Sequence, residues 1–173
     1  MPERNTPAKK IAYCGMLTAL AMIFSYVESL IPISFGVPGI KLGLANLVVL
    51  NGLYILRPRE VLAVSVSRIL LMGFLFGSGM SILYSLGGGL LSFAVMVLLL
   101  RTKLFSRIGV SVAGAVAHNA GQLLVAALVL RSGALIAYAP ALLISGAVTG
   151  GAIGLLSEMV TKAVGKTSEN GSV

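Results

Sequence analysis

Arg68, His118 and Gln122 are strongly polar side chains that lie in the middle of long apolar runs. A charged side chain costs about 2.5–3.5 kcal/mol at the centre of a bilayer even on lenient scales. If these runs cross a membrane, Arg68 must therefore face a protein interior or a water-filled cavity. Gln122 follows His118 by four residues and falls on the same helix face, with Asn119 beside it. We expect the functional site in a cavity that these groups line.

The guanidinium of Arg68 is a planar fork of N–H donors that suits a carboxylate or a phosphate, so we interpret Arg68 as an anion-binding residue. The alternative is a structural pair with Glu28 or with helix carbonyls. For His118 the alternatives are contact with a ligand or proton, and an interhelical hydrogen bond of about 1 kcal/mol or less. We expect Glu28 to anchor a loop, or to pair with Lys41 or Arg68, rather than to act as an acid.

The segment PGIKLGLANLVVLN carries Lys41, Asn46 and Asn51 at increasing depth. We expect Lys41 and Asn46 to contact a ligand beneath a covering loop, residues 32–41, whose glycines allow close backbone approach. The alternative is that Lys41 reaches to the membrane interface and the asparagines bond to neighbouring helices, and we prefer this interpretation for Asn51.

Several other classes of site are not expected. The chain has one His, one Cys and no Asp, too few ligands for a metal site. Cys14 lies in an apolar stretch and is expected to pack as a small hydrophobic residue. No phosphate-binding P-loop is present, so an ATP-driven step would belong to a partner. The basic residues are scattered between apolar runs, which argues against nucleic acid, and no cofactor is expected.

Composition identifies an integral membrane protein. Hydrophobic residues make up 57% of the chain and charged residues 10%, with a mean hydropathy of +1.01. Soluble proteins average about 25% charged residues. We expect a short cytoplasmic segment at 1–10, a single transmembrane domain at 11–161, and a cytoplasmic tail without fixed structure at 162–173.

The predicted fold is all-α, a bundle of six transmembrane helices. The candidate spans are residues 11–31, 40–56, 61–76, 80–100, 108–130 and 134–157. The second and third are near the lower limit of about 17 residues, and Pro58 can begin the third helix early. Three consecutive glycines, 87–89, indicate a bend, a very close helix contact or an unwound segment in the fourth span.

The basic residues predict that both termini are cytoplasmic and that the protein crosses the cell membrane several times. With that orientation ten basic residues lie inside and two lie outside, Lys41 and Arg131. The inner set is Arg4, Lys9, Lys10, Arg57, Arg59, Arg101, Lys103, Arg107, Lys162 and Lys166. Arg68 and His118 then each lie about 15 Å deep in their helices, so the two side chains can meet near the midplane.

Small residues recur at the spacing of close helix contacts in the first span, at Ala8, Ala12, Gly15 and Ala19. Similar stripes occur in the fifth and sixth spans. Most such stripes pack the bundle itself, and one that faces outward would be a docking face for another membrane subunit.

Three segments carry a family resemblance: PGIKLGLANL, SRILLMGFLFG around Arg68, and GAVAHNAGQLLVA around His118. With the six short spans they resemble the family called heptaprenyl diphosphate synthase component I, also known as the Gx transporter family, over nearly the whole chain. By fold this family is similar to the substrate-binding S components of energy-coupling factor (ECF) transporters. The resemblance implies a membrane subunit that captures a small molecule outside the cell and associates with a transmembrane scaffold and two cytoplasmic ATPases.

The resemblance also implies that the first helix contacts the scaffold through an AxxxA-like pattern. The nearest match is the set Ala8, Ala12, Gly15 and Ala19, of which the last two give a GxxxA inside the membrane. Polyprenyl diphosphate synthases resemble one another in holding Mg²⁺ on paired aspartate-rich motifs, and this chain has no Asp, so it is not expected to be an enzyme by itself.

These inferences predict a substrate-binding subunit for uptake of a small anionic or amphipathic metabolite, of the vitamin or isoprenoid and quinone precursor type. Its partners would be that metabolite, membrane lipid and an ATP-driven module of the ECF type. Its expected ligand contacts are Lys41, Asn46, Arg68, His118, Asn119 and Gln122. One alternative is a non-catalytic membrane subunit that assists polyprenyl diphosphate or quinone biosynthesis. Another is a proton-coupled carrier with His118 as the relay.

Overall fold

The computed structural model describes residues 7–30, 43–131 and 133–170, and over these ranges the chain is helical throughout apart from short turns. It forms six α-helices and one 3₁₀ helix: α1 (Pro7–Leu30), α2 (Leu44–Ile55), α3 (Pro58–Phe76), α4 (Gly79–Thr102), α5 (Arg107–Leu130), η1 (Gly133–Tyr138) and α6 (Ala139–Asn170). The predicted all-α class and the six helices are confirmed.

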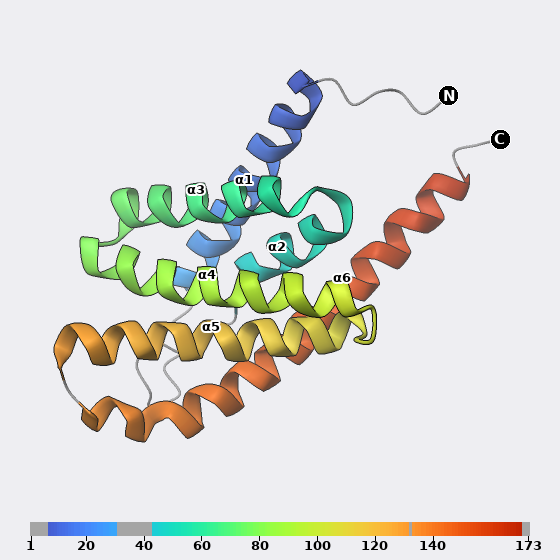
Figure 1. The fold of residues 1–173 in the computed structure, drawn as a ribbon. Coiled ribbons are helices and arrows are strands. Elements are labelled where there is room, and N and C mark those ends of the chain that lie inside the picture. The colour runs from blue at the N-terminus through green and yellow to red at the C-terminus, as the bar shows by residue number, and fades with distance from the viewer. Residues whose placement is uncertain (1–6, 31–42, 132, 171–173) are drawn as a thin grey trace.

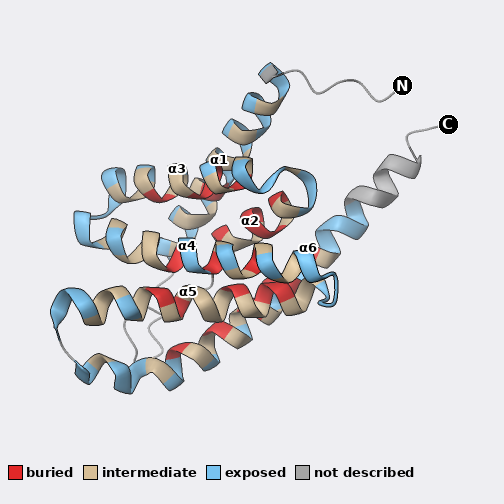
Figure 2. Cartoon of the chain, in the orientation of Figure 1, coloured by how far each residue is buried: buried red, intermediate tan, exposed pale blue. Residues whose placement is uncertain are grey.

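The helices pack as a bundle in which α4 lies along α5, and α5 along α6, while α1 packs on α2 and α3 (Figure 1). The short helix α2 sits in the interior, where Val49 and Leu50 are almost fully buried against Val61, Met96 and Val110 of α3, α4 and α5. Figure 2 shows that buried positions gather where these helices face one another, whereas the outer faces are exposed and rich in large apolar residues. Exposed apolar outer faces are expected of a protein that is surrounded by lipid.

The six α-helices differ in length more than the six spans predicted from the sequence. Within the described residues, four stretches are long and apolar enough to cross a membrane: Ala8–Leu30, Gly79–Thr102, Arg107–Leu130 and Gly133–Ala163. Helix α2 has 12 residues. At 1.5 Å per residue it extends about 18 Å, well short of the hydrocarbon thickness of about 30 Å. It begins after Gly43, whose φ of 75° is left-handed. Ala45 in its first turn is buried, so the start of α2 lies inside the bundle and not at its surface.

Local signals explain where the other helices begin. Helix α3 starts at Pro58, as the first-turn preference of proline predicts, and the Glu60 carboxylate accepts a hydrogen bond from the Arg57 backbone N–H at 3.0 Å. Ser78 caps α4 and Ser106 caps α5, each accepting a backbone N–H three residues on. Helix α6 continues to Asn170 instead of ending at the predicted tail, because residues 158–164 contain good helix formers and no proline.

The three glycines at 87–89 neither bend nor unwind α4, which is one continuous helix. They allow a very close helix contact. A Cβ placed on Gly121 of α5 would lie 2.6 Å from the Gly87 carbonyl oxygen, and one placed on Gly88 would lie 2.7 Å from the His118 carbonyl oxygen. Of the three interpretations open from the sequence, close contact is the correct one, and it sets the spacing of α4 and α5 beside His118.

Arg107, at the start of α5, forms hydrogen bonds to α2 and α6. Its Nη1 donates to Asn51 Oδ1 at 3.1 Å, to Ser157 Oγ at 3.3 Å and to Thr161 Oγ1 at 2.7 Å. Its guanidinium carbon lies 3.8 Å from the centre of the Tyr54 ring. Asn51 thus bonds to neighbouring helices, as the sequence interpretation preferred. The start of α5 is thereby fixed to the last turns of α2 and to residues 157–161 of α6.

Apart from Arg68 and Arg131, the described basic residues gather at one end of the bundle, where α1 begins, α2 turns into α3, α4 turns into α5, and α6 ends (Figure 1). Lys10 of α1 lies 4.0 Å from Glu60 of α3 at this end. Arg131 lies at the opposite end, after α5. The distribution agrees with the positive-inside pattern. The assignment of the basic end to the cytoplasm stays a prediction.

Candidate functional site

A polar cavity of about 60 Å³ lies at the meeting point of all six α-helices, and we call it the Arg68 cavity. Residues from every one of the six helices line it: Glu28, Gly43, Ala45, Asn46, Arg68, Ser85, Ala115, His118, Asn119, Gln122 and Thr149. Because each wall belongs to a different helix, the cavity changes shape when any helix moves relative to the others.

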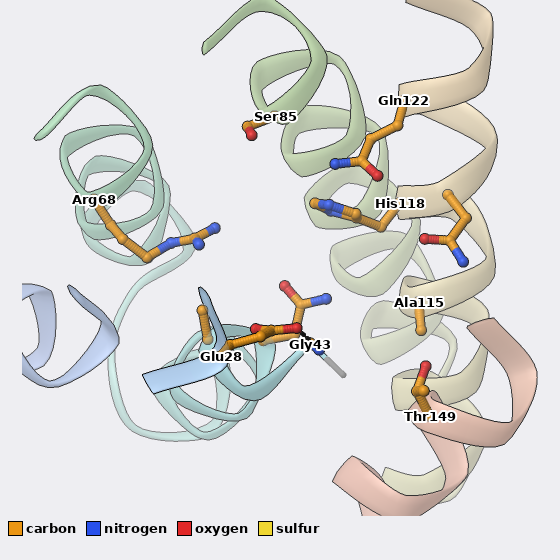
Figure 3. A pocket seen from close by; sticks show the side chains of 11 residues that line it. Glu28, Gly43, Arg68, Ser85, Ala115, His118, Gln122 and Thr149 are labelled. Atoms are coloured by element: carbon orange, nitrogen blue, oxygen red, sulfur yellow. Dashed lines mark hydrogen bonds between the residues drawn. The ribbon is translucent and has the colours of Figure 1, made fainter. Parts of the chain in front are cut away.

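Arg68 enters the cavity from α3 and points toward His118 and Gln122 of α5 on the opposite wall (Figure 3). Its Nη1 donates to Ser25 Oγ of α1 at 3.0 Å. Its Nε is buried and has no hydrogen-bond partner among the described residues. A guanidinium has more donors than one serine can use, so Arg68 retains donors for an acceptor inside the cavity.

Glu28 fastens α1 to the start of α2. Its Oε1 accepts a hydrogen bond from the Gly43 backbone N–H at 2.6 Å. The same carboxylate lines the cavity beside Arg68, so the formal charges of the two side chains balance. Whether the cavity favours anions or cations therefore depends on the other groups that line it.

The N-terminus of α2 is the additional positive element. Gly43, Ala45 and Asn46 all line the cavity, and among the described residues the side-chain contact at this helix end is that of Glu28 Oε1 with the Gly43 N–H. The first backbone N–H groups of a helix lack intrahelical partners, and the aligned peptide dipoles place roughly half a positive charge there. Together with Arg68, this helix end favours an anionic or acceptor-rich group.

His118 and Gln122 lie one turn apart on α5 and both line the cavity, as their spacing predicts. They pack directly on Gly88 of α4: a Cβ on that glycine would lie 2.7 Å from Gln122 Cγ and 3.1 Å from His118 Nε2. The absence of a side chain at Gly88 therefore leaves the room that these two side chains occupy.

Asn119 lines the cavity but also joins α5 to α6. Its Nδ2 donates to the Leu142 carbonyl oxygen at 2.6 Å, and Gly146 of α6 packs against the same amide. Interhelical bonds of this kind are common in membrane bundles. The structure thus gives Asn119 a packing function, and its contact with a ligand stays a prediction.

Of the six residues predicted to bind a ligand, the structure brings five around one cavity: Asn46, Arg68, His118, Asn119 and Gln122. Lys41 and the covering loop 32–41 lie outside the described residues. The sequence interpretation missed Ser25, Ser85 and Thr149. A single hydroxyl in an apolar run is a weak signal because it can bond to its own helix, as Thr149 does with the Ser145 carbonyl oxygen at 2.9 Å.

The small-residue stripe of α1 faces outward. All four of its members are exposed: Ala8, Ala12, Gly15 and Ala19. A Cβ placed on Gly15 would meet no atom within 4 Å, so nothing in the described chain covers this face. By contrast, Gly150 and Gly154 of α6 pack tightly on α5.

No group of three or more His, Cys, Asp or Glu residues that could hold a metal ion occurs in the described part of the chain.

Comparison with known proteins gives one match. The family model described as heptaprenyl diphosphate synthase component I matches residues 17–160. This range begins within α1 and contains all the lining residues of the Arg68 cavity. No curated protein and no solved structure matches the chain.

Proposed function

The chain belongs to the heptaprenyl diphosphate synthase component I family, and from that premise we propose that it is a non-catalytic membrane subunit that binds a small acidic metabolite in the Arg68 cavity for uptake. The ligand's acceptor group lies between the Arg68 guanidinium and the N-terminus of α2, with His118 and Gln122 on the opposite wall.

One observation carries this proposal: the Arg68 guanidinium, whose buried Nε has no described partner, points into a cavity that six helices build (Figure 3). An unsatisfied buried donor costs about 1–3 kcal/mol, and more when it is charged. A carboxylate or phosphate oxygen that accepts from Arg68 removes that cost, and the charge-assisted bond is among the stronger hydrogen bonds. The α2 N-terminus acts in the same direction, as half-helix ends do toward anionic substrates in other transporters.

The energy for uptake is proposed to come from an ECF-type partner, a transmembrane scaffold with two cytoplasmic ATPases. Support comes from the exposed stripe of α1, where small residues let a partner helix approach closely. Further support is the resemblance of the family to S components.

The second candidate is a membrane subunit that assists polyprenyl diphosphate or quinone biosynthesis. The name of the family favours it, since it designates a component of a synthase. Affinity purification from the native membrane separates the two functions. Recovery of two ATPases with a membrane scaffold supports uptake, whereas recovery of a soluble synthase without them supports the second candidate.

The binding function is tested by native mass spectrometry of the protein purified from its own host. We expect a small acidic molecule to remain bound to the wild-type chain and to be lost from Arg68→Ala. Arg101→Ala is the matched control, because Arg101 is exposed at the end of α4 and does not line the cavity. Elution volume and melting temperature report whether each variant is folded. A folded Arg68→Ala protein that keeps the bound molecule refutes the assignment.

A further inference from the structure

A second cavity adjoins the Arg68 cavity and differs from it in size and chemistry. Its volume is about 430 Å³, and it lies between α4, α5, η1 and α6. We call it the Tyr84 cavity, and its lining residues are Ser81, Tyr84, Ser85, Gln122, Leu123, Ala126, Leu130, Leu135, Tyr138 and Leu142. Apart from two serines, a glutamine and the tyrosine hydroxyls, this lining is hydrocarbon.

The two cavities meet at Ser85 and Gln122, which line both. Figure 3 shows these two side chains on one side of the Arg68 cavity, opposite Glu28 and Thr149. From His118 the α5 helix continues past Gln122 to Leu130, and the Tyr84 cavity follows it to that end of the bundle. The two cavities are therefore adjacent, with Ser85 and Gln122 at their common boundary.

The volumes show what each cavity can hold. Pockets for small metabolites measure roughly 300–1,000 Å³. The Arg68 cavity, at about 60 Å³, accommodates a head group but not a whole metabolite of that size. The Tyr84 cavity is large enough, but none of its described lining residues is charged. The charge recognition and the room for a ligand body thus lie in separate, adjoining compartments.

We propose that the two cavities form one binding site for an amphipathic acid, and this inference rests on the proposed function. The carboxylate or phosphate head accepts hydrogen bonds from Arg68. The hydrocarbon chain passes between Ser85 and Gln122 and fills the Tyr84 cavity. The substrate class is thereby narrowed from small acidic metabolites in general to those that carry an apolar chain.

The chain also provides an internal comparison. A groove of similar volume, about 420 Å³, lies on another side of α5 and is lined by Ala120, Leu123, Leu124, Ala127, Leu128, Arg131, Gly133, Ile136, Ala139 and Leu143. It shares no lining residue with the Arg68 cavity. Ala126 lines the Tyr84 cavity and Ala127 lines this groove. The same substitution, made at either of these neighbouring positions, therefore fills one of the two spaces and leaves the other unchanged.

The test uses the full chain in lipid nanodiscs and straight-chain carboxylates from acetate to dodecanoate, with affinity referred to the free aqueous concentration. Each added CH₂ group that becomes buried should tighten binding about fourfold, until the chain outgrows the cavity and the affinity reaches a plateau. Ala126→Phe should remove this dependence on chain length, and Ala127→Phe should leave it intact. Arg68→Ala should weaken binding of every chain length.

Different failures refute different claims. If binding depends on Arg68 but not on chain length, the two-cavity site is wrong and the proposed function stands. If the series binds without depending on Arg68, or if neither the carboxylates nor the matching alkyl phosphates bind saturably, the proposed acid recognition is wrong. Should Ala126→Phe fail to fold, Leu142→Ala shortens a buried lining residue, enlarges the same cavity and must move the plateau to longer chains. An unchanged plateau in that variant overturns the two-cavity site.

Discussion

The backbone contact between α4 and α5 makes a sharp prediction for Gly121→Ala. The added Cβ would lie 2.6 Å from the Gly87 carbonyl oxygen and 3.0 Å from the Gly88 Cα, which are backbone atoms of a continuous helix and cannot rotate away. An ordinary van der Waals contact begins near 3.4 Å. The two helices must therefore separate by several tenths of an ångström along this face.

Two effects of opposite sign decide the magnitude. Overpacking in a close-packed interior costs about 1–3 kcal/mol, and alanine gains up to about 1 kcal/mol over glycine in helix propensity. Because the clash is with backbone on the partner helix, we expect overpacking to win and Gly121→Ala to lower the free energy of unfolding by about 1–2 kcal/mol. Gly151 of α6 is the control, since its Cβ would meet no atom within 4 Å. Gly151→Ala should leave stability unchanged or raise it by up to about 1 kcal/mol.

The assay is reversible unfolding of both variants in the same mixed micelles, followed by circular dichroism. The decisive result is whether Gly121→Ala has a lower free energy of unfolding than Gly151→Ala. A Gly121→Ala protein as stable as Gly151→Ala would refute the close α4–α5 contact, and with it the account of how Gln122 is held at the mouth of the Tyr84 cavity.

Three further predictions concern the site, the basic end and the docking face. Glu28→Gln keeps an acceptor for the Gly43 N–H but removes a negative charge. A titration should therefore show that an acidic ligand binds severalfold more tightly to this variant. Weaker binding would indicate that an amine of the ligand contacts Glu28 instead. Arg107→Ala removes three hydrogen bonds between helices and should lower the unfolding free energy by about 2–3 kcal/mol, measured in micelles; a loss below 0.5 kcal/mol would count against the cluster. Gly15→Leu adds a side chain in open space and should reduce recovery of a membrane partner without changing the melting temperature, whereas Gly151→Leu, equally open, should not.

The sequence alone predicts the helical class, the number of helices and most boundaries, because apolar runs and their Pro, Gly and Ser punctuation are local signals. Pro58 illustrates this, since it begins α3 at the first-turn position where proline is favoured. The length of α2 was harder to predict. Its apolar run already begins in the preceding residues, and α2 starts later than that run, after the left-handed Gly43.

The composition of the site was predictable in part, because a cation and an imidazole in apolar helices must both face inward. His118 and Gln122 follow from helical spacing. The hydrogen bond from Asn119 to the Leu142 carbonyl oxygen of α6 was not predictable, because it depends on how α5 and α6 are rotated about their axes. No local sequence pattern determines that rotation. The Tyr84 cavity has the same origin: it is an unfilled volume between α4, α5, η1 and α6, and ordinary leucines and alanines line it.

The contact of Gly87 and Gly88 with Gly121 has a consequence for how this site can diversify during evolution. Main-chain atoms meet there, so the spacing of the two helices does not depend on the size of any side chain at the crossing. Substitutions at Tyr84 or Leu123 can then reshape the apolar compartment while that crossing stays unchanged. Descendants of one ancestral gene can in this way change the shape of that compartment and retain the same packing of α4 on α5.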